Sequence, residues 1–315
     1  MPKLVVTSRR KHGVGAAILC VIVSALVSSC ATGVGAPNDP RKHVVTTFTV
    51  LADMTRAVAG DTVSVESITK PGSEIHEYQP TPSDLMRGAR ADLVLDNGFG
   101  LERWFERFLD QTESPHVTLT DGVEPISIGD RDTSDGRAVN PHAWMSPANA
   151  KIYVANIRDA LVELEPAHAA EFHANANAYL AELDAIERTL AAELRAVPEP
   201  HRALVTCEGA FSYLARDAGL REAYLWPVNS DQEGTPQQVK NTTAFVRDND
   251  VPAVFCESTV NPQAQHQVAE EADARFAGTL YVDSLSAPDG PVPTYLDLLR
   301  HDTRTILDGL GGTNR

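Results

Sequence analysis

Two histidines and two carboxylates occupy positions in the sequence where metal ligands could be brought together. His76 and His142 each lie in a loop stiffened by prolines, and Glu208 and Asp283 each directly follow a predicted strand. Because open α/β sheets bind ligands at the carboxyl ends of their strands, these four side chains can converge on one cleft. Imidazole and carboxylate form a mixed ligand set that suits first-row divalent metals. The residue types are therefore compatible with a metal site, but each of the four residues, taken alone, is more often an ordinary structural residue than a functional one.

The chain alternates short apolar runs with helical stretches, which is the pattern of a parallel α/β sheet. Runs rich in β-branched residues predict strands at 44–50, 63–68, 91–95, 116–119, 203–207, 253–256 and 279–282. Helical patterns lie between them, at 51–58, 82–89, 101–109, 148–164, 211–218, 236–248, 263–274 and 294–310. Thr81 is placed to cap the helix that begins at Pro82.

One segment has the periodicity of a single long amphipathic helix. Its apolar residues recur at spacings of three and four, at Phe172, Ala176, Tyr179, Leu183, Ile186, Leu190, Leu194 and Val197. The pattern predicts a helix of about 30 residues, roughly 45 Å long, which a Pro-Glu-Pro sequence at 198–200 ends. We therefore expect two α/β lobes with parallel sheets, at 44–165 and 198–315, joined by one long backbone helix at 166–197.

The N-terminus has the features of an export signal. Arg9, Arg10 and Lys11 precede an apolar run at 14–27, which is too short to span a bilayer but typical of a signal peptide. The run ends in small residues before Cys30 and resembles the bacterial lipobox, in which the cysteine is acylated. We therefore expect a lipoprotein signal peptide at 1–29, a tether at 30–43, and an exported protein anchored by lipid to the outer face of the cell membrane. The alternative is an ordinary signal peptide with an incidental cysteine.

Composition and net charge limit the classes of partner that the protein can have. The chain carries 27 Lys and Arg against 43 Asp and Glu, a net charge of −16, so we expect no nucleic-acid partner. With 43% hydrophobic residues it can bury a core. Cys20 lies in the predicted signal, which leaves Cys207 and Cys256 in the folded part. They can form a disulfide outside the cytosol or remain buried thiols, and the sequence leaves both alternatives open.

The four sequence segments around the predicted ligands resemble the signatures of a known family. They are Gly-Ser-Glu-Ile-His-Glu-Tyr-Gln-Pro-Thr-Pro-Ser-Asp around His76, Asn-Pro-His-Ala-Trp-Met-Ser-Pro around His142, Cys-Glu-Gly-Ala-Phe-Ser-Tyr around Glu208, and Tyr-Val-Asp-Ser-Leu-Ser around Asp283. Together they are similar to the metal-receptor family of ABC importers, from about Val44 to the C-terminus. The resemblance implies two lobes bridged by a rigid helix, a metal between them, one ligand from each of the four residues, and a membrane permease with its ATPase as partners.

The third ligand position bears on which metal is carried. Zinc receptors of this family usually have a histidine there and a long histidine-rich loop before the second motif, whereas this chain has Glu208, and its loop at 129–137 contains no histidine. The segment 226–236 resembles that of manganese and iron receptors. Two carboxylates also permit coordination numbers above four, which suit manganese better than zinc. We favour manganese as the cargo. Zinc and iron remain alternatives, because the intrinsic affinity of such a site rises from manganese to zinc.

A different class of function, a secreted metallohydrolase, would use Glu208 or Asp283 as a general base. Catalytic metal sites usually keep one position open for water, which four protein ligands would occupy, and the chain has no His-Glu-x-x-His sequence. We therefore expect a monomeric receptor and no enzyme. His168 and His173, on the predicted long helix, are expected to face solvent.

The lipobox interpretation predicts the behaviour of a Cys30→Ala variant. Acyl chains contribute about 0.8 kcal/mol per buried methylene to membrane binding, so this variant should leave the membrane fraction while remaining folded. Fractionation of cells expressing the two forms measures this. Unchanged membrane association of the variant would contradict the lipobox interpretation.

Overall fold

The computed structural model describes residues 39–105, 114–128, 138–229 and 234–311. Residues 41–315 form one compact unit. The predicted signal peptide, Cys30 and most of the predicted tether lie outside the described residues. Within the described residues, no helix has both the length and the apolar character needed to cross a membrane.

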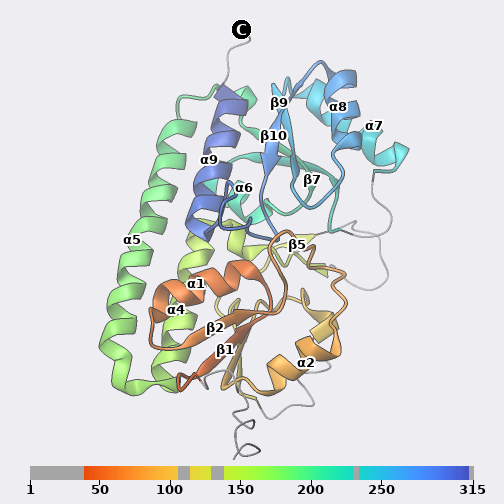
Figure 1. Ribbon diagram of the computed structural model, residues 1–315. Coiled ribbons are helices and arrows are strands. Elements are labelled where there is room, and N and C mark those ends of the chain that lie inside the picture. The colour runs from red at the N-terminus through yellow and green to blue at the C-terminus, as the bar shows by residue number, and fades with distance from the viewer. Residues whose placement is uncertain (1–38, 106–113, 129–137, 230–233, 312–315) are drawn as a thin grey trace, which may run out of the picture. The chain divides into compact units, whose positions relative to one another are not determined.

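The N-terminal lobe contains a four-stranded parallel sheet (Figure 1). Its strands, in the order β2-β1-β3-β4, are β2 (Ser64–Ser67), β1 (His43–Thr46), β3 (Leu93–Asp96) and β4 (His116–Thr118). All residues of β3 are buried, because parallel strands joined by helical crossovers are covered on both faces. The helices α1 (Thr49–Ala59) and α2 (Pro82–Ala89) follow β1 and β2. Thr81 caps α2 as predicted, in a reciprocal capping box with Asp84.

The C-terminal lobe contains two pairs of parallel strands. Strand β7 (Ala203–Glu208) pairs with β8 (Arg221–Trp226), and β9 (Ala253–Glu257) pairs with β10 (Arg275–Leu280). The pairs lie side by side through β7 and β9, which a Cys207–Cys256 disulfide joins. The Gln265 amide also donates to carbonyl oxygens of both strands. The helices of this lobe are α6 (Ser212–Ala218), α7 (Pro236–Asp248), α8 (Gln263–Ala272) and α9 (Tyr295–Gly311).

Two antiparallel helices lie in the sequence between the strands of the two lobes. Helix α4 (Pro147–Leu164) and helix α5 (Ala169–Leu194) are separated by a short 3₁₀ turn, Pro166–His168. Every member of the apolar stripe predicted for the long helix is buried, and the helix packs against α1, α4 and α9 (Figure 1). Because α1 lies in the N-terminal lobe and α9 in the C-terminal lobe, α5 is in contact with both. It contains neither proline nor glycine, so no residue that commonly kinks helices interrupts it.

The α/β fold with parallel sheets and a long helix is therefore confirmed, but several element bounds were predicted wrongly. The first strand ends at Thr46, and the remaining apolar residues of 44–50 begin α1, because burial against the sheet outweighs their β propensity. Strand β10 begins at the exposed Arg275 and ends at Leu280, with a register shift at Gly278. The long helix has 26 residues, fewer than the predicted 30. Part of the predicted helix at 101–109 lies outside the described residues.

Strands β8, β5 (Ser127–Ile128) and β6 (Ala138–Val139) were not predicted at all. Strand β8 begins with the charged residues Arg221 and Glu222 and is only half-buried over most of its length. A charged, partly exposed edge strand lacks the continuous apolar run on which the other predictions depended.

The disulfide should make a large contribution to stability. The two cysteines are 49 residues apart, so cross-linking them restricts the unfolded chain, and bridges of this kind contribute about 2–4 kcal/mol. A Cys207→Ala/Cys256→Ala double variant should lose about this much free energy of unfolding, measured by guanidinium denaturation. Addition of a thiol reductant should lower the midpoint of the wild-type protein and leave the double variant unaffected. An equal midpoint for both proteins without reductant would contradict the stabilising role.

Candidate metal centre

The structure brings the four predicted side chains together at the seam between the lobes. Their ligand atoms all lie within 4.8 Å of one another: the Nε2 atoms of His76 and His142 are 3.0 Å apart, and each is 3.4 Å from Glu208 Oε1. Asp283 Oδ1 lies 3.7 and 3.9 Å from the same two nitrogens. A tetrahedron around an ion with bonds of about 2.1 Å has edges of about 3.4 Å. The donor atoms therefore have the spacing of a coordination shell.

His142 is oriented by the residue two positions before it. The Asn140 side-chain oxygen accepts hydrogen bonds from the backbone N–H of His142 and from its Nδ1, 2.8 Å away. With Nδ1 donating, the lone pair of the imidazole is on Nε2, which faces the other three residues. The Asn140 amide also donates to Gly209 O, next to Glu208, across the seam. One buried asparagine thus fixes both the tautomer of His142 and the distance to the opposite lobe.

His76 lies in a turn that hydrogen bonds from neighbouring residues stabilise. The carboxylate of Glu74 accepts hydrogen bonds from the backbone N–H groups of His76 and Glu77. The indole of Trp104 donates to Ile75 O from the opposite side. Only 6% of the His76 side chain is exposed, compared with none for the other three residues. His76 is therefore the most exposed of the four candidate ligands, and a cavity of about 300 Å³ opens beside it.

The two carboxylates differ in how their oxygens are used. Glu208 is the last residue of β7, and its Oε1 accepts a hydrogen bond from the backbone N–H of Asn229, while its Oε2 is buried without a partner. Asp283 Oδ2 accepts hydrogen bonds from Thr259 and Asn229, and its Oδ1 is buried without a partner. Because an unpaired buried carboxylate oxygen is costly, these two oxygens fit atoms that would bind a cation.

The segment that carries Asp283 is also tied to the N-terminal lobe on both sides. The Trp144 indole donates to Val282 O at 3.1 Å, and Ser284 Oγ accepts from the backbone N–H of Gly72 at 2.7 Å. Asp283 lies three residues beyond the end of β10, not directly after it as predicted. The position of this carboxylate therefore depends on contacts between lobes and not on the strand alone.

Without a metal, a proton balances part of the charge of the site. Burial disfavours the imidazolium form of His76, but the carboxylates of Glu208 and Asp283 outweigh it and raise its pKa to about 9. Burial likewise disfavours the charged form of Asp283, yet the nearby imidazoles of His76 and His142 hold the pKa of this carboxyl below its usual value. A divalent cation could replace this proton because it satisfies the same carboxylates.

Comparison with known proteins identifies the family. Residues 44–309 match the family described as zinc-uptake complex component A, periplasmic. The chain belongs to this family. It is 48% identical over 301 residues to the iron-binding protein YfeA of Yersinia pestis, covering 94% of this chain and 96% of that protein. It is 33% identical over 294 residues to the manganese-binding lipoprotein MntA of Halalkalibacterium halodurans, covering 92% and 96%.

A solved structure has the same fold as this protein. The Mn-bound periplasmic metal binding protein from Candidatus Liberibacter asiaticus superposes with a TM-score of 0.80 and 39% sequence identity, over 86% of this chain and all of that one. The predicted family, that of the metal-binding substrate-binding proteins of ABC importers, is thus confirmed. Its members include proteins named for iron, manganese and zinc, so membership alone does not fix the metal.

Sequence reasoning missed three residues that support the carboxylates. Asn229 contacts both of them, Thr259 contacts Asp283, and Glu257 accepts from the backbone N–H of Glu208. Asn229 lies inside the segment 226–236 that the resemblance singled out, but nothing in the sequence indicated its contacts. Nothing in the sequence around Thr259 and Glu257 indicated that they contact the carboxylates. Outside the site, His168 and His173 are exposed, as predicted.

The pKa of His76 implies that metal and proton compete. Below about pH 9 the metal-free site holds a proton on His76 that a metal must displace, so apparent affinity should fall about tenfold per pH unit as the pH is lowered. Calorimetry between about pH 6 and about pH 8, in buffers of different ionisation enthalpy, measures both the affinity and the proton released. An affinity that stays constant over this range, without proton release, would contradict the competition.

Proposed function

We propose that this protein is the extracytoplasmic substrate-binding protein of an ABC importer and captures a divalent transition metal, with manganese as the favoured cargo. The observation that carries this proposal is the buried cluster of His76, His142, Glu208 and Asp283 with its two unpartnered carboxylate oxygens. We assign one ligand to each of these residues. The bound metal would be delivered to a membrane permease driven by its ATPase.

The chemistry of the donor set supports manganese over zinc. Glu208 can offer Oε2 in addition to Oε1, so the two imidazoles, Glu208 and Asp283 Oδ1 provide up to five donor atoms. Zinc is satisfied by four, whereas manganese accepts more oxygen ligands. The similarity to a protein named as iron-binding keeps iron as a direct alternative, because Fe²⁺ lies next to Mn²⁺ in affinity and accepts similar ligands. Zinc remains the third alternative.

The N-terminal features complete the proposal. We assign residues 1–29 to a signal peptide and Cys30 to a lipid anchor on the outer face of the cell membrane, with 30–43 as the tether. The relative MntA is named as a lipoprotein, which supports this assignment. We treat 44–165 and 198–315 as the two lobes and 166–197 as the helix that joins them. The receptor would act as a monomer.

Substitution of the ligands tests the site. Replacing any one of the four residues by alanine removes a donor and leaves the other buried charges poorly balanced, so Mn²⁺ affinity should fall by about tenfold or more. Titration calorimetry, with elemental analysis of protein purified without added metal, measures this. His173→Ala is the matched control, because this histidine is exposed on α5, and its affinity should equal that of the wild type.

The transport role is tested separately from binding. A strain that lacks the gene should take up less Mn²⁺, and the wild-type gene should restore uptake while the His142→Ala gene should not. Parallel uptake of Fe²⁺ and Zn²⁺ identifies the physiological cargo. Near-native affinity of the Glu208→Ala protein would remove Glu208 from the ligand set, and unchanged uptake of all three metals by the deletion strain would contradict the receptor role.

A further inference from the structure

Asn229 is in contact with both carboxylates of the site. Its backbone N–H donates to Glu208 Oε1 at 2.8 Å, and its side-chain Nδ2 donates to Asp283 Oδ2 at 3.5 Å. The residue is 7% exposed and follows the end of β8, whereas the two carboxylates come from β7 and from the segment after β10. One residue therefore bridges two acidic side chains, one at the end of β7 and one in the segment after β10.

The orientation of the Asn229 amide is fixed by a tryptophan. Trp226 Nε1 donates to Asn229 Oδ1 at 2.9 Å, and because an indole N–H can only donate, the amide oxygen must face it. The NH₂ group is then the end that is turned toward Asp283. Trp226 also pairs with Glu208 in the register of β7 and β8, so two of the three partners of Asn229 belong to the same pair of strands.

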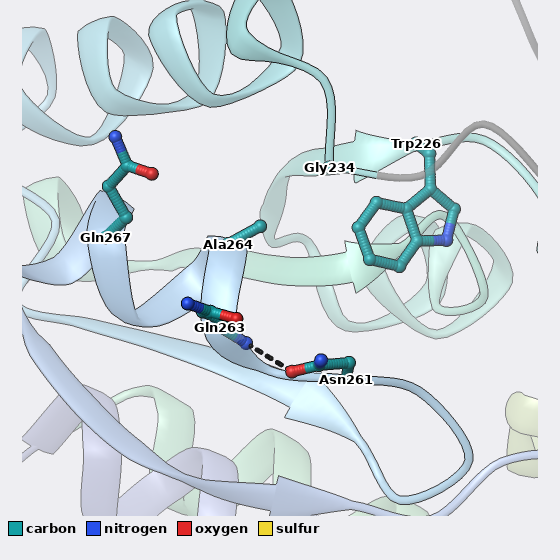
Figure 2. A pocket seen from close by; sticks show the side chains of 6 residues that line it. All are labelled: Trp226, Gly234, Asn261, Gln263, Ala264 and Gln267. Atoms are coloured by element: carbon teal, nitrogen blue, oxygen red, sulfur yellow. Dashed lines mark hydrogen bonds between the residues drawn. The ribbon is translucent and has the colours of Figure 1, made fainter.

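The other side of Trp226 faces a surface cavity. Its ring forms one wall of a surface cavity of about 360 Å³, whose other lining residues are Gly234, Asn261, Gln263, Ala264 and Gln267. Figure 2 shows the six-membered ring of Trp226 facing these residues, while the indole nitrogen lies on the far side of the ring. The tryptophan side chain is only 2% exposed, so its N–H is directed inward to Asn229 and not to solvent.

We propose that Asn229, oriented by Trp226, is a positioning residue that decides which carboxylate oxygens reach the metal. With Asn229 and Thr259 both donating to Asp283 Oδ2, only Oδ1 of that carboxylate is free of a protein partner. With Asn229 N–H on Glu208 Oε1, the second oxygen Oε2 remains buried and unpartnered. Asp283 Oδ2 accepts two hydrogen bonds and has no lone pair left for a metal, so Asp283 is restricted to one donor oxygen. Within the part of the chain that the structure describes, Glu208 Oε1 accepts only one hydrogen bond and keeps a second lone pair, so Glu208 is left able to provide two donor oxygens.

The proposal rests on the proposed function, since it concerns how the same site binds its metal. It predicts that the coordination geometry changes when the bridge is removed, even though all four ligands remain. Without the Asn229 amide, Asp283 loses a donor to Oδ2 and its carboxylate can rotate. Loss of a residue that orients ligands typically lowers metal affinity by about 10–100-fold.

The experiment compares wild type with Asn229→Ala, Trp226→Phe and Asn156→Ala. Asn156 is the matched control, because its amide donates two hydrogen bonds to backbone oxygens far from the four ligands. Mn²⁺ affinity is measured by calorimetry, and coordination geometry by the visible absorption of bound Co²⁺, which weakens as the coordination number rises above four. A merely structural role for Asn229 would leave the Co²⁺ spectrum unchanged.

We expect Asn229→Ala to bind Mn²⁺ at least about tenfold more weakly and to alter the Co²⁺ spectrum, and Trp226→Phe to change both in the same direction by a smaller amount. Asn156→Ala should match the wild type in both measurements. Wild-type affinity and spectrum in Asn229→Ala would overturn the proposal. If that variant does not fold, Trp226→Phe decides: an altered spectrum supports the proposal and an unaltered one overturns it.

His142→Ala separates this proposal from the proposed function. If wild type and His142→Ala bind Mn²⁺ equally well, the four residues are not the metal site, and both proposals fall together. If His142→Ala loses binding while Asn229→Ala keeps the wild-type affinity and spectrum, the metal site stands and only the positioning role of Asn229 is overturned.

Discussion

The arrangement of the lobes depends on the need to balance two carboxylates that are shielded from water. The side chains of Glu208 and Asp283 are fully buried, and each has one oxygen without a protein partner. Burying an ionised carboxylate is costly unless positive charge or hydrogen-bond donors compensate it. In this structure the two histidines of the opposite lobe provide that compensation. The negative charge of the carboxylates in one lobe is thus balanced by side chains of the other lobe. The closed seam and the metal-binding chemistry are consequences of the same constraint.

Hydrogen bonds across the seam keep these charges at a fixed distance. Asn140 reaches the backbone beside Glu208, and Trp144 reaches the backbone beside Asp283, while His142 lies between them in the sequence. A short loop thus carries one ligand and two contacts that position the ligands opposite. Helix α5 adds a scaffold that touches both lobes and contains no proline or glycine. A site built in this way combines rigid support with a small opening near His76, where the exposed fraction is highest.

Much of this architecture could be predicted from the sequence, because the buried elements carry strong periodic signals. The apolar stripe of α5 was predicted residue by residue, and α2 and α7 begin and end where the sequence indicated. Features that depend on tertiary contacts were missed: β8 is a half-buried edge strand, and Thr49 and Val50 are helical because α1 packs against the sheet. Asn229 could not be recognised because its importance lies in contacts with residues distant in the sequence. The four candidate metal-binding residues were named from the sequence because the segments around them resemble the signatures of a known family. The structure brings their side chains together, and their role as ligands stays a prediction.

The disulfide has a further consequence for the choice of metal. In the sequence, Cys207 immediately precedes Glu208, and Cys256 immediately precedes Glu257. The two sulfur atoms and a Glu257 oxygen lie within 4.8 Å of one another, close enough to hold an ion if the sulfurs were thiolates. Thiolates are soft ligands that select zinc and monovalent copper. A reduced chain would therefore offer these metals a second, competing binding site next to the carboxylate and imidazole donors. Oxidation to the disulfide removes both of these soft donors, and the side chains of His76, His142, Glu208 and Asp283 offer only nitrogen and oxygen to an incoming ion.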